Sequence, residues 1–225
     1  MVRSIVVKMQ FNVVYILLAA LLIIFASGCT TPSLRLYNAA LDGDNSNVSA
    51  LLDEGADINY HGGDAQGATP LMAASQKGHI ETVKLLLMEG ADVNAVTNLG
   101  ETALYFALEH PEIIKLLLYA GADTELATTT TYSTPLNVAA SKKGLTETVK
   151  ALINAGADVN TIDTFGFTPL YWASMHGNTE YVKLLLDAGA DVKPNSGWFG
   201  TALGIAKSNK HEEIVRLLME AGATE

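Results

Sequence analysis

Side chains that could carry out chemistry are few in this 225-residue chain, and they are widely spread. None of the histidines has a metal-binding spacing such as H-E-x-x-H. Recurring aspartates each follow a Gly-Ala pair, which predicts turns rather than paired catalytic carboxylates. No nucleophile elbow or phosphate-binding glycine loop is present. The sequence therefore predicts no catalytic site, cofactor or metal, and an enzyme with an unrecognised site is the least favoured alternative. The histidines are His61, His79, His110, His176 and His211, and the recurring aspartates are Asp57, Asp92, Asp123, Asp158 and Asp191.

The single cysteine, Cys29, follows a segment with the features of an export signal. Arg3 and Lys8 precede the apolar run Val13–Phe25, and the small residues ASG lead to the cysteine. This arrangement resembles the lipobox of bacterial lipoproteins, although alanine replaces the usual leucine three places before the cysteine. The resemblance implies a lipoprotein signal peptide over residues 1–28.

The same resemblance implies that Cys29 becomes the lipidated N-terminus and that residues 29–33 form a short tether. Thr30, which is not aspartate, favours the periplasmic side of the outer membrane in this family, with the inner membrane as the alternative. Two other interpretations stay open for the first segment: an uncleaved transmembrane anchor and an ordinary cleaved secretory peptide. The unbroken apolar run of 13 residues is short beside the roughly 20 that a membrane span needs.

Charge and cysteine content limit the classes of partner. Without residues 1–28 the chain has 12 basic and 24 acidic residues, a formal charge of −12. Such a balance repels nucleic acid and anionic membrane surfaces, so we expect neither as a partner. A lipidated Cys29 leaves no thiol for a disulfide, so stability has to come from packing.

The elements that position these residues are clearest in the stretch from Gly67 to Asn94. Thr69 can cap a first helix that begins at Pro70, and Gly78 suits the left-handed turn that ends it. A second helix follows with an apolar stripe of Val83, Leu86 and Leu87 at helical spacing. One such helix–turn–helix unit cannot bury both of its faces, so it requires neighbours.

Those neighbours are present as repeats. The capping threonine recurs with spacings of 33, 32, 34 and 33, and a closing glycine recurs with spacings of 35, 31, 35, 33 and 33. With the patterns T-P-L-x-x-A and G-A-D-V-N, this period resembles the ankyrin repeat. The resemblance implies an all-α ankyrin-repeat solenoid of about six helix-turn-helix repeats, forming a monomeric array. The threonines are Thr69, Thr102, Thr134, Thr168 and Thr201, and the glycines are Gly55, Gly90, Gly121, Gly156, Gly189 and Gly222.

The repeats are expected over residues 34–59, 60–94, 95–125, 126–160, 161–193 and 194–225. The chain departs from the family where the histidine of T-P-L-H, which links adjacent loops, is expected. Other residues occupy that position throughout, which puts the usual link between loops in doubt. They are Met72, Tyr105, Asn137, Tyr171 and Gly204.

In ankyrin arrays a concave face formed by inner helices and loop tips binds partners. Large apolar residues gather on this face toward the C-terminal half of the chain. Aromatic side chains are the usual anchors of protein interfaces, so these residues are candidates for partner contact. Phe167 and Phe199 are instead expected to pack between neighbouring loops. For Phe106, Trp172 and Met175, partner contact and packing between repeats stay open alternatives. The candidate partner-binding residues are Phe106, Trp172, Met175 and Ile205 on helices, with Phe165 and Trp198 in loops.

The function expected from these features is non-catalytic protein binding at the periplasmic face of a bacterial envelope membrane, where the chain scaffolds or protects an envelope protein. The alternative is an immunity lipoprotein that neutralises a toxin delivered into the periplasm. Both interpretations require a protein partner.

Replacing Cys29 with serine tests the lipid anchor. Because serine offers no thiol for thioether formation, we expect loss of lipid labelling and accumulation of uncleaved precursor. Metabolic labelling with palmitate and electrophoretic mobility report both effects. Normal processing of the Cys29→Ser variant would contradict lipidation at this residue.

Overall fold

The structure, a computed structural model, describes residues 31–194 and 200–224, and this part of the chain contains twelve helices. Trp198, Phe199 and Cys29 lie outside the described residues. The helices are α2 (Pro32–Asp42), α3 (Asn45–Asp53), α4 (Pro70–Lys77), α5 (Ile80–Met88), α6 (Ala103–Phe106), α7 (Pro111–Tyr119), α8 (Pro135–Ser141), α9 (Thr146–Asn154), α10 (Pro169–Met175), α11 (Thr179–Asp187), α12 (Ala202–Ser208) and α13 (Glu212–Glu220).

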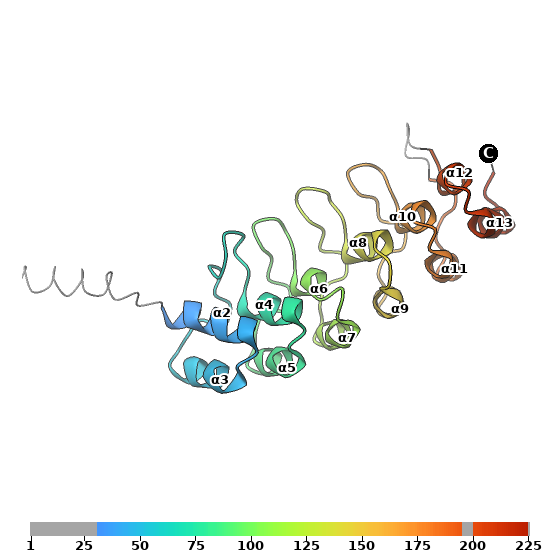
Figure 1. The fold of residues 1–225 in the computed structure, drawn as a ribbon. Coiled ribbons are helices and arrows are strands. Elements are labelled where there is room, and N and C mark those ends of the chain that lie inside the picture. Colours follow the sequence, from blue (N-terminus) through green and yellow to red (C-terminus); the bar gives the residue numbers. More distant parts are fainter. Residues whose placement is uncertain (1–30, 195–199, 225) are drawn as a thin grey trace, which may run out of the picture.

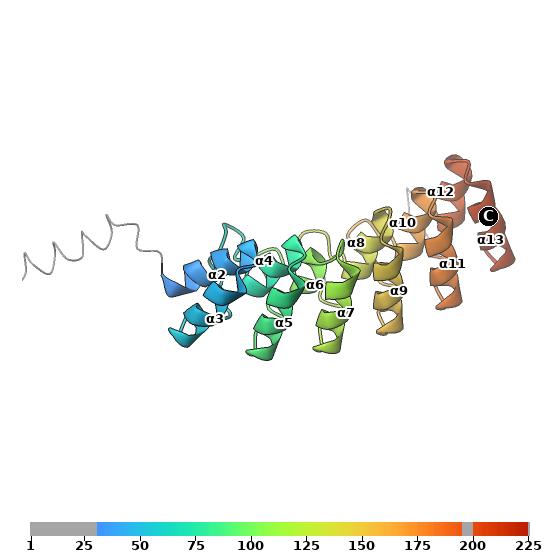
Figure 2. The same ribbon diagram turned by 60° about the horizontal axis from the view of Figure 1, so that its bottom comes forward.

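The helices stack as pairs in two rows, which confirms the predicted all-α solenoid. Even-numbered helices form an inner row and odd-numbered helices an outer row, while the long loops project to one side (Figure 1). Figure 2 shows successive pairs following one another along the array. Neighbouring inner helices pack against each other, and each packs against its own outer helix, except that the short α6 packs on α4 and α7 but makes little contact with α8.

The inner helices begin where the sequence places a threonine cap. The hydroxyl of Thr69 accepts from the Met72 amide at 3.4 Å, and the later capping threonines make the same bond. Thr31 also caps a helix, accepting from the Leu34 amide at 3.2 Å. Helix α2 therefore begins at Pro32, two residues before the expected start of the first repeat, and takes in the end of the expected tether.

Alanine and leucine form one core that runs through the stack. Alanines such as Ala74 and Ala139 are fully buried between inner helices, where a small side chain permits close approach. On the outer helices, Val83, Leu86 and Leu185 are fully buried. Burial of this one face provides most of the stability of such short helices.

A ladder of hydrogen bonds connects the turns that close the repeats. Asn59 Oδ1 accepts from the Asp92 amide at 2.8 Å, one repeat further on. The amides of Asp123, Asp158 and Asp191 donate equivalent bonds. Their acceptors are the side-chain oxygens of Asn94, Glu125 and Asn160 respectively. At the start of the array, Ser33 Oγ accepts from the Asp57 amide at 3.0 Å. This turn ladder fixes the register of each repeat on the one before it.

The loops are also linked, although the family's histidine is absent. Backbone amides make the connections: Asn98 to the Gln66 carbonyl and Thr129 to the Leu99 carbonyl, both at 2.8 Å. Asn137, at the histidine position itself, donates to the Phe167 carbonyl of the next repeat at 3.4 Å. Adjacent loops are therefore linked mainly through main-chain hydrogen bonds, which do not require the histidine.

Histidines in the turns between helices have a structural role. His79 Nε2 lies 3.1 Å from the Leu41 carbonyl oxygen of the preceding repeat, and His211 Nε2 lies 3.3 Å from that of Met175. Because a carbonyl only accepts, each imidazole donates here. Both histidines therefore connect a turn to the preceding repeat.

A buried leucine tests how far damage spreads along the array. Leu185→Ala empties fully buried volume in α11, so we expect a loss of about 2–5 kcal/mol of unfolding free energy. Because repeats contact only their neighbours, hydrogen exchange should rise in the last two repeats and much less in the first two. The matched variant Leu51→Ala in α3 should give the reverse pattern. Equal loosening everywhere in either variant would contradict nearest-neighbour stability.

Candidate partner-binding face

The inner face, defined as the exposed side of the inner helices with the loops that project beside it, holds the predicted partner-binding residues that the structure describes, which leaves out Trp198. Phe106, Trp172, Met175 and Ile205 are half-buried there. Phe165 lies in a loop and is 55% exposed. Phe106 is in the third repeat and Trp172 in the fifth, so the predicted residues belong to two separate neighbourhoods.

In the fifth repeat, aromatic rings connect the loop to the inner helix. Phe167 is buried and stacks on Tyr171 of its own repeat, with centroids 4.1 Å apart and an angle of 4°. Its ring meets Trp172 edge-on at 5.2 Å, and Phe165 stacks on its outer side at 5.8 Å. Trp172 in turn stacks on His176 at 5.9 Å. These five residues form the fifth-repeat aromatic cluster.

Asp163 holds this cluster in place. One carboxylate oxygen accepts from the amides of Phe165 and Phe167, both at 2.9 Å, and the other accepts from Trp172 Nε1 at 3.0 Å. Asp163 is only 6% exposed, and these bonds compensate for its burial. Trp172 thus packs within its own repeat and is half-buried. Asp64 accepts the same two loop bonds in the second repeat. The repeat pattern could therefore identify Asp163 as a turn residue, but it gives no sign of the bond between Asp163 and Trp172.

Tyr132 stands at a strained position in the fourth loop. Its φ is 50°, and the equivalent positions in other repeats, two before the capping threonine, are Gly67, Gly100 and Gly166 with φ of 76–79°. Bulky residues rarely adopt this left-handed region. The side chain is 62% exposed, so packing does not repay the strain. Backbone strain of this kind concentrates at functional sites.

Tyr132 and Phe165 lie on connected loops. The Thr131 carbonyl, directly before Tyr132, accepts from the amide of Thr164, directly before Phe165, at 2.9 Å. Ile162, in the same loop as Phe165, is 60% exposed. Tyr132, Ile162 and Phe165 are here called the loop-tip patch, a set of exposed apolar side chains next to the aromatic cluster.

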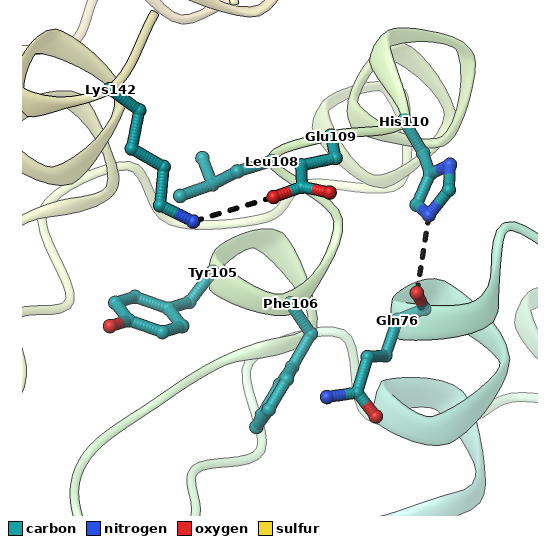
Figure 3. Close-up of a pocket in the computed structure, with 7 residues that line it drawn as sticks. All are labelled: Gln76, Tyr105, Phe106, Leu108, Glu109, His110 and Lys142. Carbon is teal, nitrogen blue, oxygen red and sulfur yellow. Dashed lines mark hydrogen bonds and ion pairs between the residues drawn. The ribbon is translucent and has the colours of Figure 1, made fainter.

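The third repeat has a hollow where its inner helix is short. Helix α6 contains only four residues, because Glu109 and His110 lead straight into α7, which Pro111 opens. The space left has a volume of about 290 Å³ (Figure 3). Lys142 Nζ reaches across it to Glu109 at 3.7 Å. The third-repeat hollow is lined by Gln76, Tyr105, Phe106, Leu108, Glu109, His110 and Lys142.

Residues around the hollow make contacts within the fold. His110 Nε2 lies 3.1 Å from the Gln76 carbonyl oxygen of the preceding repeat, and the ring of Tyr105 meets that of Phe106 edge-on at 6.0 Å. Burial, with a smaller contribution from the charge of Glu101, raises the pKa of Tyr105. Tyr105 therefore stays neutral at physiological pH and offers a hydroxyl and a ring face, groups suited to binding.

Two general observations concern the described part of the chain. No group of three or more His, Cys, Asp or Glu side chains there is placed to hold a metal ion. None of its helices has the length and apolar character required to cross a membrane.

Comparison with known proteins gives the family. Residues 36–128 and 129–224 each match a family model described as ankyrin repeats in three copies. The chain therefore belongs to the ankyrin-repeat family. Ankyrin repeats mediate protein–protein interactions, and the fold is generally a non-catalytic scaffold.

Solved structures show the same architecture. An ankyrin repeat domain from Acinetobacter baumannii is 33% identical, with a TM-score of 0.77 over 84% of this chain and 98% of that one. A chain in the complex of the predatory endopeptidase Bd0816 from Bdellovibrio bacteriovorus with immunity protein Bd3460 is 28% identical. Its TM-score is 0.72 over 83% of this chain and 97% of that one.

Relatives found by sequence are much longer proteins. A probable E3 ubiquitin-protein ligase from Oryza sativa, XBOS33, is 39% identical over 83 residues, which are 37% of this chain and 16% of that protein. This similarity concerns the repeats, since so little of the relative is matched.

Replacing Tyr132 with glycine tests the backbone strain. Glycine adopts φ of 50° freely, and the relief outweighs the greater entropy of the unfolded chain. We expect the unfolding free energy to rise by about 0.5–1 kcal/mol. The matched variant Gly67→Ala places a Cβ at φ of 79° with no atom nearer than 3.5 Å, so it should lose stability through strain alone. Thermal denaturation measures both, and a lower melting temperature for Tyr132→Gly would contradict the strain.

Proposed function

We propose that this chain is a non-catalytic protein-binding module. A lipid on Cys29 holds it at the periplasmic face of a bacterial envelope membrane, and the outer membrane is preferred over the inner one. There it scaffolds or protects an envelope protein. The observation that carries the binding function is the fifth-repeat aromatic cluster continued by the exposed loop-tip patch.

The cluster has the properties of a prepared binding surface. Asp163 fixes Trp172 and the loop by three hydrogen bonds, so little side-chain entropy remains to be lost when a partner binds. Phe165 and Tyr132 are large, exposed and near one another, and aromatic residues are the usual anchors of interfaces. Exposed apolar side chains gathered on one edge are typical of an interaction site.

The position of the anchor supports a role near the membrane. Because α2 begins at Pro32, only Cys29 to Thr31 would separate the lipid from the first repeat. Three extended residues span at most about 11 Å. The array would therefore remain close to the membrane surface, and its fifth-repeat cluster would lie at the end away from the anchor (Figure 1).

The alternative is an immunity lipoprotein that binds and neutralises a toxin delivered into the periplasm. The similarity to a chain from the Bdellovibrio complex between an endopeptidase and its immunity protein favours it, since it covers 97% of that chain. Both functions use the same kind of binding face and differ in the partner.

Site-specific photocrosslinking in the bacterial envelope tests the binding face. A photoreactive benzoyl-phenylalanine at Phe165 should form a covalent adduct with a defined partner. The matched position is Tyr119, an aromatic residue that is 95% exposed at the end of the outer helix α7, where we expect no such adduct. Adducts of equal yield from both positions, or none from Phe165, would contradict the proposed face.

Mass spectrometry of the adduct separates the two functions. A resident envelope protein supports the scaffold, whereas a toxin that is captured only after contact with a rival cell supports immunity. In the second case the chain should also protect a cell that expresses the toxin.

A further inference from the structure

The inner helices, taken with the turns that follow them, differ in the sign of their charge from the whole chain. The full sequence has a net charge of −10. In repeats two to six, the inner helices and the turns that follow them contain five lysines and a single acidic residue, Glu109. All five lysines are exposed and lie at or near the ends of inner helices. They form the lysine row, which consists of Lys77, Lys142, Lys143, Lys207 and Lys210.

Ion pairing separates Lys77, Lys142, Lys143 and Lys210 of this row from most of the basic residues on the outer helices. Four of the five basic residues on the outer helices of these repeats pair with glutamates, as Lys150 does with Glu147 at 3.2 Å and Glu180 at 3.3 Å. In the row, Lys142 has only the 3.7 Å contact with Glu109. Within residues 31–194 and 200–224, no ion-pair partner is found for Lys77, Lys143 or Lys210.

We infer that the lysine row binds an acidic segment of the protein partner. The inference rests on the proposed function and gives the partner's chemistry. An acidic segment is repelled by most of this surface and attracted at one edge of the inner face, so charge fixes where and in which orientation it docks. Lysines whose charge is not used inside the fold are free to make that contact.

The third-repeat hollow provides the middle of this site. It is lined by Gln76, the neighbour of Lys77 in the second repeat, and by Lys142 of the fourth (Figure 3). The pair of Lys142 with Glu109 is long and both side chains are largely exposed, so it is easily exchanged. A carboxylate of the partner takes the place of Glu109 beside Lys142, and the volume of about 290 Å³ receives a neighbouring side chain of the segment.

Spacing sets the length of the segment. Packed helices lie roughly 10 Å apart, so the lysines of the second and fourth repeats are about 20 Å apart. An extended chain covers that distance in about six residues. The preferred ligand is therefore an extended stretch with acidic residues at both ends of a six-residue span.

Acetylated hexaglutamate amide is the probe for this site, titrated into the full-length isotope-labelled chain in detergent. Despite the net charge of −10, we expect chemical-shift changes confined to residues near Lys77, Glu109 and Lys142. The double variant Lys77→Glu/Lys143→Glu should weaken binding at least tenfold. Its matched control is Lys115→Glu/Lys193→Glu, which changes the net charge equally at exposed positions outside the row and should retain most of the affinity.

Three results would overturn the inference: no localised shifts, equal loss of binding in both double variants, or binding of a six-residue oligodeoxynucleotide as tight as that of hexaglutamate. The last would show a site for any polyanion. All four substituted lysines are exposed, and unchanged melting curves verify that the variants fold. Because the titration uses no natural partner, its failure together with successful crosslinking at Phe165 would reject the acidic segment and leave the proposed function standing.

Discussion

Burial of helix faces between neighbouring repeats is the interaction on which the whole array depends. Each helix pair is too short to be stable alone, and its alanines and leucines find partners only in the next pair. Small residues such as Ala74 and Ala139 let the inner helices approach, while the turn ladder from Asn59 onward fixes how each repeat is placed. The loops inherit their positions from this stack, and so do the residues of the inner face.

A local shortening loosens this arrangement at one point, since α6 makes little contact with α8 while α7 still packs on α9. Helix α6 is reduced to four residues, yet Leu104 and Leu108 remain buried and the Leu108 carbonyl accepts from Thr148 Oγ1 of the next repeat at 2.8 Å. These contacts, with the packing of α7 on α9, continue the core past the short helix. The third-repeat hollow shows how a repeat protein can acquire a recess without a new element.

Much of the fold could be predicted from the sequence, because the caps and turn glycines act locally and recur at a fixed period. The exposure of Phe165 and the burial of Phe167 could also be predicted, but not the packing of Phe167 on the inner helix of its own repeat. The bond from Trp172 to Asp163, the φ of Tyr132 and the recess beside Glu109 were not foreseen. Each depends on where a loop lies against a helix or a neighbouring repeat, which no spacing encodes. The placement of Trp198 and the lipidation of Cys29 stay predictions.

The turn ladder also gives the array two unequal ends. In successive repeats the accepting side chains are Ser33, Asn59, Asn94, Glu125 and Asn160. The next side chain in the series is Lys193, which has donors only and cannot accept from the final turn. Among the described residues the sixth repeat is thus held by one bond of this ladder fewer, so fraying should start there and proceed toward the first repeat. A protease or an unfolding force would open the sixth repeat before the others.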